Sequence, residues 1–216
     1  MKAEAALVDR DRLAATYLSA KSFVRAQGFG PEIAWQESRA LAAVDETTFL
    51  AEAAWVILSS GMREKVVRSK FPAISSAFLH WEGAVAIESA RDQCRSAALQ
   101  VFNHDPKIDG ILEVAAHVAV NGFDCVRTRL GVEGPDYLRR FPFLGPVTAL
   151  HLAKNLGMDI VKPDRHLVRI AGAAGFETPE TMCKVIARGI GERLSVVDVV
   201  LWRFATLRPD YIAFFA

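Results

Sequence analysis

Apolar residues recur at helical spacing along nearly the whole chain, and this regularity constrains the fold more than any other feature. Leu13, Tyr17 and Val24 suit the buried face of one helix, and Gly28 and Pro31 follow as stop signals. No segment alternates apolar and polar residues convincingly over the length of a strand. The sequence therefore predicts an all-α protein. The expected helices span residues 13–24, 32–43, 45–61, 64–78, 82–102, 108–121, 124–130, 135–140, 146–156, 165–174, 179–190 and 196–206.

Length and composition limit the class of protein. A chain of 216 residues can form one large core or two lobes that share a cleft. Apolar residues make up 51% and charged residues 24%, which is typical of a globular protein and argues against disorder. No apolar run approaches the roughly 18 residues of a membrane span, and the charged residues within positions 1–10 are not those of a signal peptide. We expect a protein of the cytoplasm or nucleoid with no membrane contact.

The cysteines give no sign of a metal centre. Cys94, Cys125 and Cys183 are widely spaced, and no Cys-x-x-Cys pair occurs. This spacing argues against a zinc site or an iron–sulfur cluster. We expect three buried thiols that pack as small apolar groups.

The net charge of +1 does not indicate a nucleic-acid-binding protein, but the distribution of charge is uneven. One stretch is rich in basic residues and contains few acids. It is either a surface for an anionic partner or an ordinary solvated face. Its basic residues are Arg127, Arg129, Arg139, Arg140, Lys154, Lys162, Arg165 and Arg169.

Residues 141–146, Phe-Pro-Phe-Leu-Gly-Pro, are too few and too apolar for a flexible loop. Phe141 and Leu144 can anchor a hairpin in the core, and Gly145 allows the backbone to turn or to approach a ligand closely. Pro146 suits the first position of the following helix. The free N–H groups at such a helix start can hold a phosphate without reading a base, although a Gly-Pro helix start is also a common structural device.

A single acid stands at the start of the next expected helix. Lys162-Pro163 favours an extended approach, which places Asp164 at the N-cap. Aspartate is among the best N-caps, so the residue also has a purely structural explanation. The backbone donors and the helix dipole stabilise its negative charge. Such a carboxylate can stabilise positive charge developing on a sugar, or orient a water that attacks it, as glycosidic bond cleavage requires.

The hairpin and the acid, in this order and at this separation, resemble the helix-hairpin-helix DNA glycosylase superfamily. The family pattern is approximately Leu-Pro-Gly-Val-Gly-x-Lys-Thr-Ala, followed by Val-Asp-x-His at the next helix. Residues 141–149 and 163–166 occupy the matching positions here, and the specific part of the match covers residues 141–171. Weaker similarity extends to about residue 45, where residues 54–60 are similar to the helix end that faces the lesion.

The resemblance implies two helical lobes that flank a DNA-binding cleft. Residues 45–157 would form the continuous lobe ending in the helix-hairpin-helix, and residues 1–44 with 158–216 would form the other. Family members flip a damaged nucleotide out of the duplex into the cleft. The resemblance then assigns Asp164 to catalysis of N-glycosidic bond cleavage, as the one residue carried over to that role.

Two departures from the family pattern refine this expectation. Val147 stands where bifunctional members carry a lysine, and valine cannot form a Schiff base, so we expect hydrolysis by water. Phe143 replaces the first glycine of the hairpin, which alters the site expected for a phosphate and for a monovalent cation. We expect no other cofactor and no metal.

The resemblance also nominates residues that contact DNA. Those of the hairpin and of the following helices are Phe143, Gly145, Val147, Thr148, Arg165 and His166. His166 has a second interpretation as an internally packed and hydrogen-bonded side chain. Gly61 stands where members often insert Gln or Asn into the gap left by the flipped base, so Met62 or Arg63 would take that role. Trp55 and Ser60 complete the expected wedge or base pocket.

Three functions remain open from the sequence. The first is a monofunctional DNA glycosylase of base excision repair that acts as a monomer on double-stranded DNA containing a damaged or modified base. The second is a helix-hairpin-helix module that binds DNA and has lost the chemistry, which the altered hairpin and wedge positions would suit. The third is a bifunctional glycosylase and lyase with a displaced lysine, Lys154 or Lys162. The excised base cannot be read from the chain.

Overall fold

The computed structural model describes residues 2–216, with side chains from Arg10 onward, and its contacts divide the chain into two compact units. The continuous unit is Ala40–Leu156, and the discontinuous unit combines Met1–Arg39 with Gly157–Ala216. The described residues form helices and no β-strand, which confirms the predicted all-α class. The predicted limits of the continuous lobe were 45 and 157, against 40 and 156 in this division.

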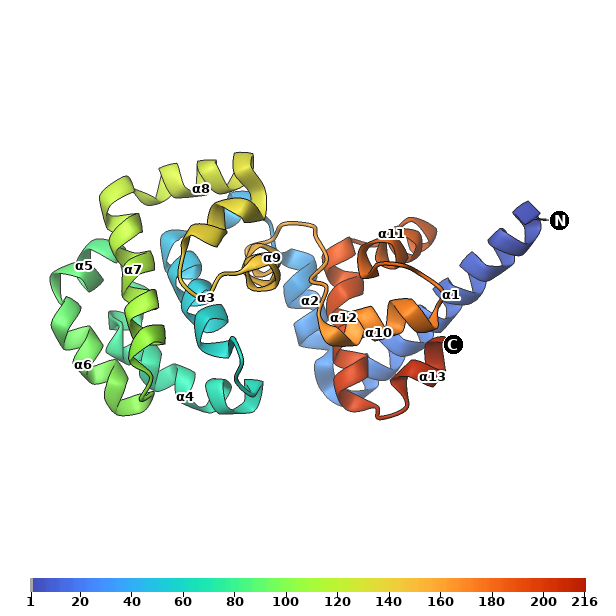
Figure 1. Ribbon diagram of the computed structural model, residues 1–216, viewed down its shortest axis with the longest axis horizontal. Helices are drawn as coiled ribbons and strands as arrows, with labels where there is room; N and C mark the ends of the chain where they lie inside the picture. Colours follow the sequence, from blue (N-terminus) through green and yellow to red (C-terminus); the bar gives the residue numbers. More distant parts are fainter. Residues whose placement is uncertain (1) are drawn as a thin grey trace. The chain divides into compact units, whose positions relative to one another are not determined.

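The continuous unit is built around α7 (Asp105–Asn121), which buries apolar side chains from Ile108 to Val118. This helix packs against α3 (Glu46–Ser59), α5 (Ala84–Ser89), α6 (Arg91–Val101) and α8 (Phe123–Glu133) (Figure 1). The helix that follows the hairpin, α9, packs against α3. The other elements are the 3-10 turns Leu41–Ala43, Leu79–Trp81 and Gly134–Arg140, and the helices α4 (Glu64–Ala77) and α9 (Pro146–Asn155).

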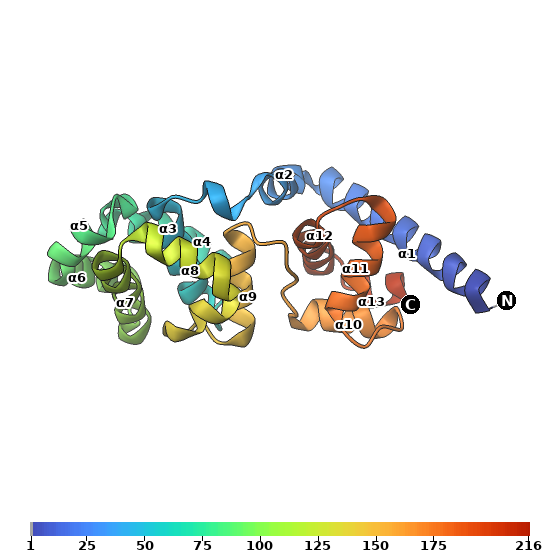
Figure 2. The same ribbon diagram turned by 90° about the horizontal axis from the view of Figure 1, so that it is seen from above.

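The discontinuous unit is assembled from both ends of the sequence. Its most buried helix is α12 (Leu194–Leu207), which packs against α1 (Lys2–Val24), α2 (Gly30–Ser38), α10 (Arg165–Ala173) and α11 (Pro179–Ile190) (Figure 2). The guanidinium of Arg203 joins α12 to Glu32 of α2 through two hydrogen bonds of 2.7 and 2.8 Å. A short helix, α13 (Tyr211–Phe215), packs against α10. Because α1 and α2 share one core with α10–α12, the unit includes both the first and the last helices of the described chain.

Local signals placed most helices correctly and failed where packing sets the boundary. Asp45 and Thr178, two residue types favoured at helix N-caps, cap α3 and α11 through their side chains. The helix predicted over 82–102 is instead broken at Ala90, where α5 ends and α6 begins, with no Gly or Pro at that point to indicate the break. The helix predicted over 32–43 ends at Ser38, the one over 135–140 is a 3-10 helix, and α13 was not predicted. No helix of the described residues is long and apolar enough to cross a membrane.

The prediction of three buried cysteines is wrong at one position. Cys94 and Cys183 are buried, but Cys125 is exposed. It lies on α8, which buries only Val126 and Leu130. Cys125 is next to Val126 in the sequence and therefore lies outside this narrow buried face.

Behind the hairpin, His117 of α7 packs among aromatic side chains. Its Nε2 lies 2.9 Å from the Tyr137 hydroxyl, and its ring meets Phe141 edge to face with centroids 5.1 Å apart. Burial lowers the pKa of His117, and the positive charges of Arg140 and Arg129 lower it further. The folded protein therefore holds this imidazole in its neutral form more strongly than the unfolded chain does.

We predict that the free energy of unfolding falls as the pH drops below about 6.5, the ordinary pKa of histidine. In that range the unfolded chain binds a proton that the folded protein does not bind at His117. One such proton lowers stability by up to about 1.4 kcal/mol per pH unit, until the pH reaches the lowered pKa. Urea unfolding at about pH 5.5 and about pH 7.5 measures the difference. It should shrink in His117→Gln but not in His80→Gln, an exposed position of the same unit; an equal difference in His117→Gln would contradict the assignment.

Candidate functional site

The hairpin, residues 141–145, is a single tight turn of the continuous unit. The N–H of Leu144 donates to the carbonyl of Phe141 at 3.2 Å, and both side chains are buried. Pro142 takes the second position of the turn, which its fixed φ suits. Phe143 takes the third position with a φ of +63°, in the left-handed region that favours glycine. The phenylalanine therefore adopts a conformation suited to the glycine that the family pattern has at this position.

The aromatic ring of Phe143 explains how this conformation is maintained. The ring packs against α7 at Gly110, where a Cβ would lie 3.3 Å from the ring and 3.2 Å from the Cβ of Pro142. It also meets the His104 ring edge to face, with centroids 6.2 Å apart. A left-handed conformation costs a residue with a Cβ about 1–2 kcal/mol. The packing of the ring on α7 offsets this cost, and glycine at position 110 leaves room for the ring.

Gly145 does not supply the turn, which corrects one of the roles predicted for it. Its φ of −72° and ψ of −174° are open to any residue. A Cβ added there would have only the Thr148 hydroxyl nearby, at 4.0 Å. Neither the backbone nor the packing of the described residues therefore requires glycine at this exposed position. The geometry is compatible with the other predicted role of Gly145, close approach by a ligand.

The start of α9 presents backbone donors next to Gly145. Pro146 is the first residue of the helix and has no N–H. Within the described part of the chain, the N–H groups of Gly145, Val147 and Thr148 have no hydrogen-bond acceptor. The Thr148 hydroxyl donates back to the carbonyl of Phe143 at 2.7 Å, which fixes the helix start to the turn. This arrangement can accept an anion, as free N–H groups at helix starts do.

Asp164 is the N-cap of α10, as predicted. Its Oδ1 accepts hydrogen bonds from the N–H groups of His166 at 2.9 Å and Leu167 at 3.1 Å. Its Oδ2 accepts none from the described residues, and the side chain is only partly buried. One carboxylate oxygen thus fixes the orientation of the group, and the other is available for a ligand or a water.

The segment that leads to Asp164 is anchored by α12. In the sequence, Ser195 and Asp198 have a spacing that resembles a capping box, but no side chain caps this helix. The carboxylate of Asp198, buried in α12, accepts a hydrogen bond from the N–H of Lys162 at 2.6 Å. Asp159 accepts from both the N–H and the hydroxyl of Ser195, at 2.9 and 3.0 Å. Asp198 therefore holds the backbone just before Asp164, and Ser195 binds the side chain of Asp159 in the same segment.

His166 is oriented by an internal contact. Its Nδ1 lies 3.1 Å from the Tyr211 hydroxyl of α13, and the two rings meet edge to face. Burial lowers the pKa of His166; the nearby Asp164 opposes this effect, and the charges of Arg165 and Arg169 add to it. His166 is therefore internally packed and hydrogen-bonded, which is the second of its two interpretations. Its contact with DNA stays a prediction.

The predicted wedge segment is the loop between α3 and α4, residues 60–63. Gly61 has a φ of +69°, which favours glycine, and Met62 and Arg63 are exposed. Within the described residues, Arg63 forms no salt bridge. Trp55 lies further back on α3, where it packs on Phe71 edge to face beneath the guanidinium of Arg68. Met62 and Arg63 therefore present exposed side chains, whereas Trp55 packs within the unit and is only partly exposed.

Lys107 contacts both the loop and the hairpin, and it was not among the predicted site residues. This buried residue of α7 donates from its ammonium to the carbonyls of Leu58 at 2.6 Å and Ser60 at 2.5 Å. The same ammonium lies 5.7 Å from the centre of the Phe143 ring. The signal that could have identified it is a lysine in an otherwise apolar helix face, one helical turn before a glycine at 110.

The arginines of the basic stretch differ in whether they have an acid partner. Each arginine between 127 and 140 forms a salt bridge of 2.8 to 3.1 Å with a neighbouring acid, so the acids of that region cancel much of its charge. Arg165 and Arg169 on the exposed face of α10 have no acid partner among the described residues. The uncompensated charge of this stretch therefore includes α10, next to Asp164. The paired residues are Arg127 with Asp124, Arg129 and Arg140 with Glu133, and Arg139 with Asp136.

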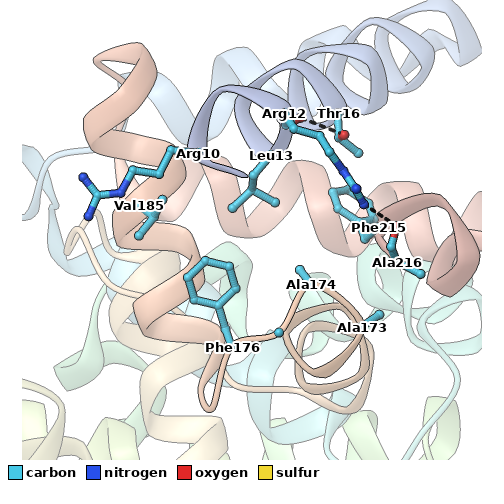
Figure 3. A pocket seen from close by; sticks show the side chains of 11 residues that line it. Arg10, Arg12, Leu13, Thr16, Ala173, Ala174, Phe176, Val185, Phe215 and Ala216 are labelled. Atoms are coloured by element: carbon cyan, nitrogen blue, oxygen red, sulfur yellow. Dashed lines mark hydrogen bonds between the residues drawn. The ribbon is translucent and has the colours of Figure 1, made fainter. Parts of the chain in front are cut away.

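A cavity of about 320 Å³ in the discontinuous unit is separate from these residues (Figure 3). The side chains of Arg10 and Arg12 from α1 lie at it, with Phe176 and Phe215 among its apolar lining. None of the predicted site residues lines it. Among the described residues, no group of three or more His, Cys, Asp or Glu side chains is placed to hold a metal ion.

The predicted site residues fall into two groups. The hairpin and the loop 60–63 belong to the continuous unit, and Asp164, Arg165 and His166 belong to the discontinuous unit. Comparisons with protein-family models, curated proteins and solved structures find no match to the chain. The two groups of residues are therefore connected only by the sequence pattern of the hairpin and the acid.

We predict that Asp164 contributes to stability through one oxygen only. Asp164→Ala removes the cap and should lower the free energy of unfolding by about 1 kcal/mol, whereas Asp164→Asn keeps a capping oxygen and should change it by a few tenths at most. Urea unfolding of the two variants measures this difference. Equal losses in both would show that the charge, rather than the cap, is what stabilises α10.

Proposed function

We propose that this chain is a monofunctional DNA glycosylase that hydrolyses the N-glycosidic bond of a damaged or modified base flipped out of double-stranded DNA. The observation that carries the proposal is the carboxylate of Asp164, which is oriented through Oδ1 and has Oδ2 open. This geometry allows the carboxylate to face a sugar without losing the contacts that hold it.

The reaction follows from the groups present. As the bond from C1′ to the base nitrogen breaks, its electron pair leaves with the base and positive charge develops on the sugar. The carboxylate of Asp164 stabilises that charge and takes a proton from the water whose oxygen bonds to C1′. The base receives a proton from solvent, so the products are a free base and an abasic site. Val147 offers no amine for a Schiff base, which supports hydrolysis rather than strand cleavage.

Other groups of the two units would bind the DNA backbone and so position the protein on the duplex. The unpaired N–H groups around Gly145 suit one phosphate, and the unpaired Arg165 and Arg169 suit others. In this proposal the two units are the lobes of a glycosylase, and the duplex contacts the hairpin of one and α10 of the other. Met62 and Arg63 then fill the space that the flipped nucleotide leaves.

We predict that Asp164→Asn abolishes base release while leaving duplex binding intact. Asparagine keeps the cap but loses the negative charge that the transition state requires, so the rate should fall by at least about a hundredfold. The assay measures free base released from duplexes that carry an oxidised purine, an alkylated purine, a deaminated base or a modified cytosine. Equal activity of wild type and variant would remove Asp164 from the mechanism.

The same panel separates the alternatives. Salt-dependent binding with no base released from any lesion would indicate the non-catalytic DNA-binding module. Covalent trapping of the protein on DNA by borohydride would indicate a lyase with a displaced lysine. Neither binding nor release would remove the proposal itself.

We predict that Gly145→Ala weakens duplex binding without unfolding the protein. The added methyl group has open space around it in the protein but would lie among the N–H groups that bind the phosphate. A hydrogen bond to a charged group is worth enough for a loss of about tenfold or more in affinity. Fluorescence anisotropy at fixed salt measures the affinity, and Gly131→Ala, which adds a methyl group to a helix of the same unit, is the matched control. Unchanged affinity in Gly145→Ala would place the phosphate elsewhere.

A further inference from the structure

Lys107 occupies an unusual position for a lysine. It lies in the first turn of α7 with only 3% of its surface exposed. Lysine is almost never buried to this extent unless its charge is paired. No carboxylate of the described residues forms a salt bridge with it, and burial lowers its pKa. The ammonium is instead satisfied by carbonyls and by an aromatic face.

The carbonyls belong to the end of α3. The last carbonyls of a helix have no partner within it and carry partial negative charge, so an ammonium is a favourable partner there. Lys107 bonds to two of them, at Leu58 and at Ser60, where the loop 60–63 begins. The contact therefore fixes the point at which the chain leaves α3 toward Met62 and Arg63.

The aromatic face belongs to the hairpin. The ring of Phe143 lies 5.7 Å from the ammonium, within the range of a cation–π interaction. Gly110 lies one helical turn further along α7, and it leaves room for Pro142 and Phe143 of the hairpin. One face of α7 thus holds both the loop and the strained residue of the hairpin.

We propose that Lys107 is a positioning residue that holds the loop 60–63 and the hairpin 141–145 in a common arrangement, so that the loop fills the gap in the duplex while the hairpin binds the phosphate. The inference rests on the proposed function, because it assigns the loop and the hairpin to DNA. It adds a buried residue with no DNA contact of its own to the determinants of lesion recognition.

The test compares binding to two duplexes of the same sequence, one intact and one with a tetrahydrofuran analogue of an abasic site. The variants are Lys107→Met, which keeps the apolar stem, and Lys107→Gln, which keeps one donor for the carbonyls. Lys70→Met is the matched control, because Lys70 also donates to a carbonyl at a helix end, that of Val101, and lies 5.8 Å from the Phe102 ring. Lys70 contacts neither the loop nor the hairpin.

We expect Lys107→Met to lower the preference for the abasic duplex by about tenfold, with intermediate loss in Lys107→Gln and none in Lys70→Met. An unchanged preference in Lys107→Met, or equal loss in Lys70→Met, would overturn the inference and leave the proposed function standing. A wild-type protein with no preference for the abasic duplex would also overturn the inference, and one that in addition releases no base from any lesion would overturn the proposed function as well.

A second measurement needs no change at Lys107. Met62→Ala and Phe143→Ala should be non-additive in their effects on binding to the abasic duplex, because both act on the arrangement that Lys107 maintains. Additive effects would show that the loop and the hairpin act independently and would contradict the inference.

Discussion

The packing of the Phe143 ring on α7 is the interaction on which the hairpin depends. Phe143 holds a left-handed backbone conformation that strains any residue with a Cβ. A side chain at position 110 would crowd the ring, because its Cβ would lie 3.3 Å from it. A protein that used glycine in the turn would avoid the strain but would lose the ring, and with it the contact to Lys107. Phe143 therefore makes the turn strained, but its ring attaches the turn to α7.

A comparable arrangement supports Asp164 in the other unit. The buried Asp198 and the pair of Asp159 with Ser195 hold the segment before it, and Arg193 donates to the carbonyl of Gly157 at 2.9 Å. These contacts all involve α12 or its N-cap, the most buried part of the unit. The open oxygen of Asp164 is thus presented from a fixed backbone rather than from a flexible loop. In the proposed function this support matters, because small displacements of a reacting carboxylate are costly in catalysis.

How far the sequence could predict this structure depended on whether the signal was local. Helix periodicity, the caps at Asp45 and Thr178 and the cap at Asp164 were all readable, since each involves residues a few positions apart. The break at Ala90 was not, because no Gly or Pro marks the point between α5 and α6, which each pack against α7. Ser195 and Asp198 had the spacing of a local cap but bond to residues 36 positions away, a distance at which sequence spacing carries no information. The candidate site followed the same rule: its hairpin and acid were found by their motifs, whereas Lys107 required the contacts of α7 with α3 and with the hairpin.

Under the proposed function, the contact pattern also changes which charges count toward recognition of DNA. Exposed pairs between arginine and a nearby acid add little to stability, so the four pairs between 124 and 140 are better understood as charge cancellation than as structural support. Arg165 and Arg169 lack such partners and lie one turn apart beside Asp164. An anion that binds these arginines lies next to the open carboxylate oxygen of Asp164. That carboxylate would repel a second anion at the same place. A polyanion with its phosphates on either side of a sugar satisfies both conditions, because it offers negative charge to the arginines and a neutral or positively charged ring to the carboxylate.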